Sequence, residues 1–182
     1  TPRSLLSVGL RAYAEDRPQR ALVYYMLAAN AGSEVGQHNA GFLFAEKLPK
    51  LPLAVAYPAM ARAYGLLATK FYKLAALQGS AAAQLQLALM VSYGGKNYAM
   101  ANELLTAAYQ AGSTDALWHL GYNYWKGHGG ASGAERNRGL ALKYIKLAGF
   151  SSKHAKLRGV DGLFFGTLAL GYKAAPPPNP PP

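Results

Sequence analysis

The residues of this chain that could do chemistry are scattered histidines, glycine-rich segments and serines that follow glycine. The 182 residues contain four histidines, and none belongs to a His-Glu-x-x-His motif or has a carboxylate at the helical spacing of a metal site. They are His38, His119, His128 and His154. We therefore interpret them as packed or surface histidines, and we predict neither a metal site nor a bound cofactor.

The glycine-rich segments 94–96 and 127–130 superficially resemble a phosphate cradle. Neither follows a predicted strand, and neither has the spacing or the Lys-Ser/Thr ending of a P-loop, so we interpret both as turns. Ser33, Ser80 and Ser113 each follow a glycine at equivalent places in the chain. Helix caps recur in this way, whereas a catalytic nucleophile is unique. We predict no catalytic residue, and we expect the chain not to be an enzyme.

The composition excludes further classes of protein. The chain has no cysteine, which excludes disulfide scaffolds, thiolate zinc sites, iron–sulfur clusters and cysteine nucleophiles. Apolar residues make up 51% of the chain, enough to bury a core. No segment reaches the roughly 18 to 20 uncharged apolar residues that a spanning helix needs, so we expect no membrane span within this chain.

The chain is basic, with 19 Lys and Arg against eight Asp and Glu and a formal charge of +11. Between Lys126 and Arg158 there are eight basic residues and one acid, Glu135. This region is either a solvated face or a site for an acidic protein partner, for lipid headgroups or for RNA phosphates. The candidate partner-binding residues are Lys143, Lys146, Lys153, Lys156, Arg158 and the apolar Phe164.

The chain contains an internal repeat, in which four segments align without gaps. The elements of this repeat must position the candidate residues described above. Each segment begins with alanine, has large side chains three and four residues later, and has another alanine seven residues later. This spacing describes one face of an amphipathic helix, and its small outer positions suit close helix packing. The predicted packing residues are Ala21, Tyr25, Ala28, Ala68, Tyr72, Ala75, Ala101, Leu105, Ala108, Ala141, Ile145 and Ala148.

The first three segments end in Gly32, Gly79 and Gly112. Glycine takes the left-handed conformation after a helix without strain from a Cβ atom. A second helix with its own columns of small residues follows each glycine, so the repeated unit is a helical hairpin. Asn97 and Asn137 lie four residues before the opening alanines of the third and fourth segments, where we expect them to cap the next helices.

The sequence therefore predicts an all-α fold, an α-solenoid of antiparallel helical hairpins over residues 1–158. The first repeat spacing contains a Pro-rich insertion near 47–58, which we interpret as an irregular loop because it holds three prolines. Residues 159–175 are apolar and do not follow the repeat columns, and we predict that they cap the last hairpin or dock against a partner. Residues 176–182 are predicted to be a polyproline tail.

The repeat pattern resembles that of a known family. The run Ala-x-x-aromatic-aromatic-x-x-Ala-x-x-x-Gly precedes a helix rich in small residues, such as 116–129 (ALWHLGYNYWKGHG). Over residues 4–152 this pattern resembles the Sel-one-like repeat, a relative of tetratricopeptide repeats. Residues 20–44 (RALVYYMLAANAGSEVGQHNAGFLF) and the insertion after them are similar to the last luminal repeats of the Sel-one/Hrd-type adaptor of the endoplasmic-reticulum degradation ubiquitin ligase.

This resemblance implies an adaptor in the endoplasmic-reticulum lumen that holds a membrane ubiquitin ligase and helps deliver misfolded glycoproteins. The first hypothesis is accordingly a non-catalytic scaffold for protein–protein interactions. The alternative is a basic structural subunit of a large organellar assembly, such as a mitochondrial ribosome or respiratory complex, in the mitochondrial matrix or another organelle. Under both hypotheses the partners are other protein subunits of a larger complex, with RNA phosphates or an acidic partner at the basic face.

Overall fold

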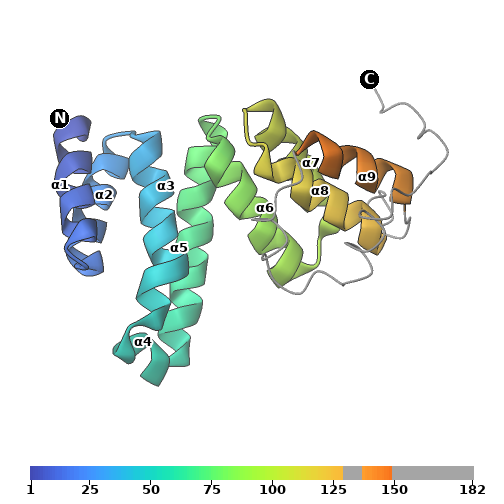
Figure 1. Ribbon diagram of the computed structural model, residues 1–182. Helices are drawn as coiled ribbons and strands as arrows, with labels where there is room; N and C mark the ends of the chain where they lie inside the picture. Colours follow the sequence, from blue (N-terminus) through green and yellow to red (C-terminus); the bar gives the residue numbers. More distant parts are fainter. Residues whose placement is uncertain (129–136, 149–182) are drawn as a thin grey trace. The chain divides into compact units, whose positions relative to one another are not determined.

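The computed structural model describes residues 1–128 and 137–148, and the chain divides into two compact units, Thr1–Met90 and Val91–Pro182. The described residues form helices and turns and contain no strand (Figure 1). This architecture confirms the predicted all-α fold of helical hairpins. The predicted cap at 159–175 and the predicted tail at 176–182 lie outside the described residues.

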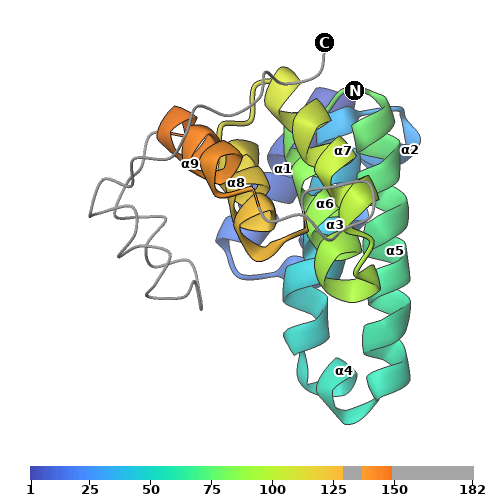
Figure 2. The same ribbon diagram turned by 90° about the vertical axis from the view of Figure 1, so that its right-hand side faces the viewer.

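The first unit is a series of helices that pack on their neighbours in chain order. Its elements are α1 (Pro2–Ala14), α2 (Pro18–Asn30), α3 (Glu34–Phe42), a π-helical turn (Leu43–Lys47), a 3-10 turn (Leu48–Lys50), α4 (Pro52–Ala56), α5 (Pro58–Leu77) and the first part of α6 (Ala81–Gly95). α1 packs on α2, α2 packs on α3, and α3 packs on α5. Figures 1 and 2 show that α3 and α5 run side by side and carry α4 at their far end.

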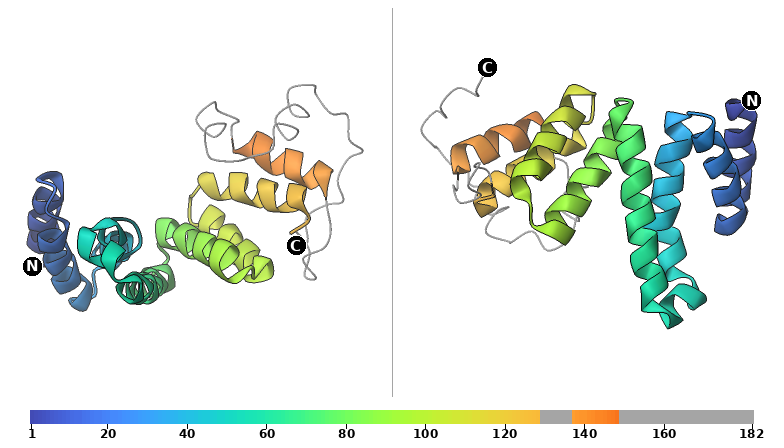
Figure 3. Two further views of the ribbon diagram at one scale, coloured as in Figure 1. Left: turned by 90° about the horizontal axis from the view of Figure 1, so that it is seen from below. Right: turned by 180° about the vertical axis from the view of Figure 1, so that it is seen from behind.

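The second unit contains the end of α6, α7 (Tyr98–Gln110), α8 (Asp115–Lys126) and α9 (Arg138–Leu147). α7 packs on α8, and α8 packs on α9, which is drawn in orange in Figure 3. The side chains of Asn97 and Asn137 cap α7 and α9. The Oδ1 atom of Asn97 accepts the N–H of Met100 at 3.2 Å, and that of Asn137 accepts the N–H of Leu140 at 2.9 Å.

The turns between the helices of a hairpin share one backbone geometry. Gly32, Gly79 and Gly112 have φ angles of +83°, +87° and +103°, a region that a Cβ atom disfavours. In each turn the N–H of the next serine donates to the carbonyl of the alanine four residues before the glycine. These distances are 3.0 Å for Ser33 and Ala28, 3.2 Å for Ser80 and Ala75, and 2.8 Å for Ser113 and Ala108.

The serines after these glycines do not all cap the next helix. The Oγ atom of Ser33 accepts the N–H of Gly36 at 3.1 Å, and that of Ser80 accepts the N–H of Ala83 at 3.4 Å. The expectation for Ser113 is wrong, because α8 begins one residue later and has Thr114 at its N-cap position. Ser113 is therefore one residue too far from the first free N–H groups of α8.

The Pro-rich insertion at 47–58 is helical, so the prediction of an irregular loop is wrong. Pro49, Pro52 and Pro58 each stand in the first turn of a helical element, namely the 3-10 turn, α4 and α5. The missing N–H of proline costs nothing at the start of a helix, and the fixed φ angle suits the helical backbone. The prolines thus start successive helical elements and separate each from the one before it.

Close helix contacts form where a large side chain of one helix faces a glycine of an earlier helix. The large side chains Tyr25, Tyr72 and Ile145 are buried. A Cβ atom added to the facing glycine would lie within 3 Å of each side chain, at 2.6 Å for Gly9 and Tyr25, 2.9 Å for Gly41 and Tyr72, and 2.6 Å for Gly121 and Ile145. Glycine therefore lets these helices approach at distances that no other residue permits.

The predicted packing residues lie on the inner sides of the helices that open the hairpins. Eleven of the twelve are buried, at or below 4% exposure. Ala148 is half-buried and follows the last residue of α9 as its C-cap. The repeat pattern describes the inner face of a helix, and α9 ends at Leu147. Ala148, the last alanine of this repeat, therefore lies just beyond that helix.

Candidate partner-binding surfaces

The helices that open the hairpins expose the side opposite their buried alanines, and two of them expose the same residue pattern there. The segments 68–75 (ATKFYKLA) in α5 and 141–148 (ALKYIKLA) at α9 place lysines two and five residues after the opening alanine and a leucine six residues after it. We name these two surfaces the lysine–leucine faces. They consist of Lys70, Lys73 and Leu74 in the first unit and of Lys143, Lys146 and Leu147 in the second.

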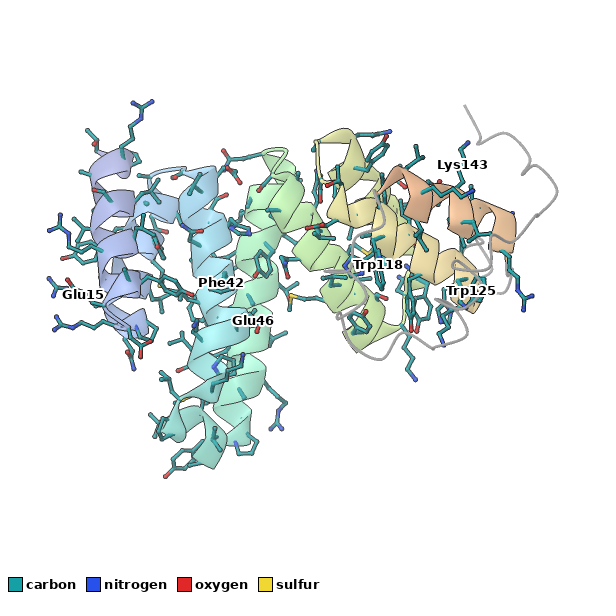
Figure 4. The ribbon with its side chains drawn as sticks, viewed as in Figure 1. Glu15, Phe42, Glu46, Trp118, Trp125 and Lys143 are labelled. Atoms are coloured by element: carbon teal, nitrogen blue, oxygen red, sulfur yellow. The ribbon has the colours of Figure 1, made fainter. Side chains whose placement is uncertain are left out.

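Both faces combine cations with exposed apolar surface. All four lysines are exposed, Leu74 is 38% exposed and Leu147 is 55% exposed. Neither α5 nor α9 contains Asp or Glu, and within the described part of the chain no ion pair engages these lysines. Figure 4 shows Lys143 extending outward from α9. Each face therefore presents two ammonium groups beside a leucine, and this combination suits an acidic partner with an apolar anchor.

The structure describes part of the basic site that the sequence predicts. Lys143 and Lys146 lie on one exposed side of α9. The remaining predicted site residues lie outside the described residues, namely Lys153, Lys156, Arg158 and Phe164. Sequence reasoning missed Lys70 and Lys73, although the repeat alignment places them in the same columns as Lys143 and Lys146. A comparison of the exposed positions of the aligned repeats would have identified these two lysines.

The first lysine–leucine face belongs to a stretch of the chain without acids. No Asp or Glu occurs from Lys47 to Asn102. The same stretch contains six basic residues, which are Lys47, Lys50, Arg62, Lys70, Lys73 and Lys96. Positive charge is therefore concentrated here as well as in the predicted basic region after Lys126, and it favours anionic partners.

A polar cluster inside the second unit holds the segment after α8. The Nδ2 atom of Asn123 donates to Oδ1 of Asn102 at 2.7 Å, and Nδ2 of Asn102 donates to the carbonyl of His128 at 2.7 Å. The His128 ring stacks on the Tyr98 ring with 3.7 Å between their centroids. Burial and the nearby charge of Lys126 lower the pKa of His128, which favours its neutral form. This histidine is therefore held by ring stacking and by a hydrogen bond to its backbone carbonyl.

The other described histidines also pack against aromatic rings. His38 lies 5.7 Å from the Tyr72 ring, and His119 lies edge-on to the Trp118 ring at 5.3 Å, whereas His154 lies outside the described residues. Across residues 1–128 and 137–148, no three His, Cys, Asp or Glu side chains are grouped so that they could hold a metal ion. Nor does any helix of these segments have the length and apolar character to cross a membrane.

Comparison with known proteins adds solved structures of the same architecture. A Sel1 repeat protein from Oxalobacter formigenes matches with a TM-score of 0.70 and 20% sequence identity, over 97% of this chain and 67% of that protein. This chain has the Sel1 repeat fold. The protective antigen c5321 of uropathogenic Escherichia coli, which has an SLR fold, matches with a TM-score of 0.64 and 25% identity over 81% of this chain. This chain spans 30% of the length of that antigen. No protein-family model and no curated protein matches the sequence.

Proposed function

We propose that this chain is a non-catalytic interaction scaffold whose lysine–leucine faces bind acidic, partly apolar segments of partner proteins. The observation that carries the proposal is the recurrence of one exposed pattern at the same repeat positions of α5 and α9. Buried columns recur in repeat proteins because neighbouring repeats must pack. An exposed leucine beside two lysines has no such packing role, so its recurrence points to a shared partner chemistry.

The spacing of each face fits a helical partner segment. Residues three apart on a helix lie about 5–6 Å from each other at their Cβ atoms, and the two lysines of each face are three residues apart. A partner helix with carboxylates one turn apart can meet both ammonium groups and place a leucine or an aromatic residue on Leu74 or Leu147. The charges accelerate the encounter, and the buried apolar contact supplies most of the affinity.

The direct test uses a fluorescent helical peptide of glutamate and leucine and measures its anisotropy on the full chain. Lys70→Glu/Lys73→Glu and Lys143→Glu/Lys146→Glu should each weaken binding at the altered face by about tenfold, which corresponds to about 1.4 kcal/mol. The matched control is Arg3→Glu/Arg11→Glu on α1, which changes the net charge equally at exposed positions outside the faces. Unchanged affinity in both lysine variants, or equal loss in the control, would contradict the proposal.

We propose further that the partner of the scaffold is a membrane ubiquitin ligase and that the chain acts in the endoplasmic-reticulum lumen. The support is the similarity of residues 20–44 and the following insertion to the luminal adaptor family. Affinity purification of the tagged chain from its native cells should retain a membrane ubiquitin ligase after nuclease treatment. Recovery of ribosomal or respiratory subunits in place of a ligase would overturn this role and leave the scaffold function intact.

The acid-free stretch from Lys47 to Asn102 favours a second candidate, a structural subunit of a large organellar assembly. Such a subunit would contact RNA phosphates or acidic proteins through these cations. RNA binding through phosphates falls steeply with added salt, because bound counterions are released. A steep salt dependence of binding to unstructured RNA would support this candidate. If the chain does not bind RNA at low salt, a role in contacting RNA phosphates is excluded.

A further inference from the structure

The hairpin of α3 and α5 ends in an exposed apolar tip. The tip consists of the 3-10 turn, α4 and the first residues of α5, and Ala54 and Leu48 are its buried anchors. Leu53, Val55 and Tyr57 are 57%, 68% and 61% exposed. Figure 1 shows α4 beyond the ends of α1 and α2, at the far end of the hairpin. These three exposed side chains therefore belong to the segment at the far end of the hairpin.

The tip offers few groups that could specify a protein partner by hydrogen bonds. In residues 48–61 (LPKLPLAVAYPAMA), Lys50 is the only charged residue and Tyr57 has the only other polar side chain. Three backbone N–H groups of the tip are already used: Leu51 donates to Leu48 at 3.1 Å, Val55 donates to Leu51 at 3.0 Å, and Tyr57 donates to Leu53 at 3.1 Å. Protein interfaces contain about one hydrogen bond per 100–200 Å², whereas apolar side chains at a lipid boundary need no such partner.

Cations lie at both ends of the tip. Lys47 precedes it, Lys50 ends its 3-10 turn, and the exposed Arg62 follows it in the second turn of α5. The nearby acid is Glu46, whose carboxylate forms a 3.2 Å ion pair with Lys50, so three cations stand against one anion. Long basic side chains can keep their charged ends at lipid phosphates while their stems lie along apolar surface.

We propose that this tip docks on an anionic lipid surface. Leu53, Val55 and Tyr57 would enter the boundary between headgroups and acyl chains, and Lys50 and Arg62 would lie at the phosphates. An apolar projection with a basic surround has the chemistry of a shallow interfacial anchor. The lysine–leucine face of the first unit begins at Lys70, more than two turns farther along α5, so the two surfaces can act separately.

The absence of cysteine from the chain permits a direct test. Val55→Cys in the full chain is labelled with an environment-sensitive NBD dye and mixed with vesicles of equal parts phosphatidylcholine and phosphatidylserine. We expect NBD emission to rise by about twofold or more and to shift to the blue, because the dye enters an apolar layer. Phosphatidylcholine vesicles should give little change. The control is labelled Leu77→Cys, at the last residue of α5, where the side chain is 85% exposed, and its emission should stay constant.

Co-sedimentation with the same vesicles provides the second measurement. Leu53→Ser/Val55→Ser/Tyr57→Ser should reduce the vesicle-bound fraction by about fivefold or more, because three apolar anchors are lost. The matched triple Val23→Ser/Leu27→Ser/Leu77→Ser removes exposed apolar residues elsewhere in the first unit and should leave the bound fraction unchanged. Circular dichroism establishes that both triple variants remain folded.

Several outcomes would overturn the lipid proposal. One is constant NBD emission at position 55 with anionic vesicles, and another is an equal rise at positions 55 and 77, which would indicate adsorption by net charge alone. A rise with polyglutamate but not with vesicles would assign the tip to an acidic protein. Binding of the glutamate–leucine peptide to the tip variant tests the scaffold function independently, so that failure of one proposal is distinguishable from failure of the other.

Discussion

A Cβ atom on Gly121 would lie 2.6 Å from Cγ1 of Ile145 and 3.0 Å from the carbonyl oxygen of Ala141, so α8 and α9 meet where no side chain fits. Gly41 bears the same relation to Tyr72 in the first unit. In both cases the glycine precedes the partner helix in the chain, and the large side chain belongs to the helix that opens the next hairpin. The interfaces between successive hairpins therefore depend on residues without side chains.

Gly121→Ala and Gly41→Ala should each lower the free energy of unfolding by about 1–3 kcal/mol, because overpacking outweighs the better helix propensity of alanine. Urea unfolding followed by circular dichroism measures the change. Gly65→Ala is the matched control, since a Cβ atom at this helical glycine in α5 would meet nothing within 4 Å. It should stabilise the chain by about 0.5–1 kcal/mol. Equal stability of Gly121→Ala and Gly65→Ala would disprove the close approach of α8 and α9.

Tyr72→Phe should leave the free energy of unfolding unchanged or raise it by about 1 kcal/mol. The ring of Tyr72 is buried, and its hydroxyl oxygen is buried without a hydrogen-bond partner in the described structure. Removing that hydroxyl ends a desolvation cost and keeps the ring against Gly41. Tyr72→Ala is the contrasting variant and should lose about 3–5 kcal/mol. A loss above 1 kcal/mol in Tyr72→Phe would mean that the hydroxyl has a stabilising partner.

Alkaline unfolding should also depend on Tyr72. Burial, and then the charge of Glu46, raise the pKa of Tyr72 above its ordinary value of 10.0. Above about pH 10, Tyr72 loses its proton in the unfolded chain and keeps it in the folded chain. The free energy of unfolding therefore falls by up to about 1.4 kcal/mol per pH unit. Unfolding titrations between about pH 9 and 11 should show a slope smaller by up to one proton in Tyr72→Phe. Identical slopes would contradict a raised pKa.

The Asn102–Asn123 pair should be replaceable only as a pair. Asn102→Ala leaves the Asn123 amide and the His128 carbonyl without their partner and should cost about 1–3 kcal/mol. Thr69 and Met90 occupy the same repeat positions in the first unit, where the Thr69 hydroxyl lies 3.9 Å from the Met90 sulfur. Asn102→Thr/Asn123→Met installs that pair and should cost less than the two single changes summed. Additive costs in the double-mutant cycle would show that the asparagines are uncoupled.

Capping by serine should differ between hairpins. Ser33→Ala removes the acceptor of the Gly36 N–H and should cost about 0.5–2 kcal/mol in thermal or urea unfolding. Ser113→Ala should change the stability by less than about 0.5 kcal/mol, because Thr114 occupies the N-cap position of α8. A larger cost at Ser113 than at Ser33 would reverse the assignment of the caps.

Sequence patterns predict the hairpins well because helix packing imposes a spacing that is visible in one chain. Ala68, Tyr72 and Ala75 recur at the spacing of a helical face, and all three are buried. The insertion at 47–58 was predicted wrongly for a local reason. Proline is common both in loops and in the first turn of a helix, so its presence does not distinguish these two structures. Only the contacts of the residues that follow the proline distinguish them.

The helical hairpins, the left-handed glycine turns and the basic character of the chain can all be predicted from the sequence, because each depends on composition or on residues that are close together in the chain. The pairing of each glycine with a large side chain is visible only in the folded chain, since Gly41 and Tyr72 are distant in the sequence and meet by packing. The tertiary structure also shows that Leu53, Val55 and Tyr57 are exposed while Ala54 between them is buried. Burial is a property of the neighbours that a residue acquires on folding, and those neighbours come from other helices.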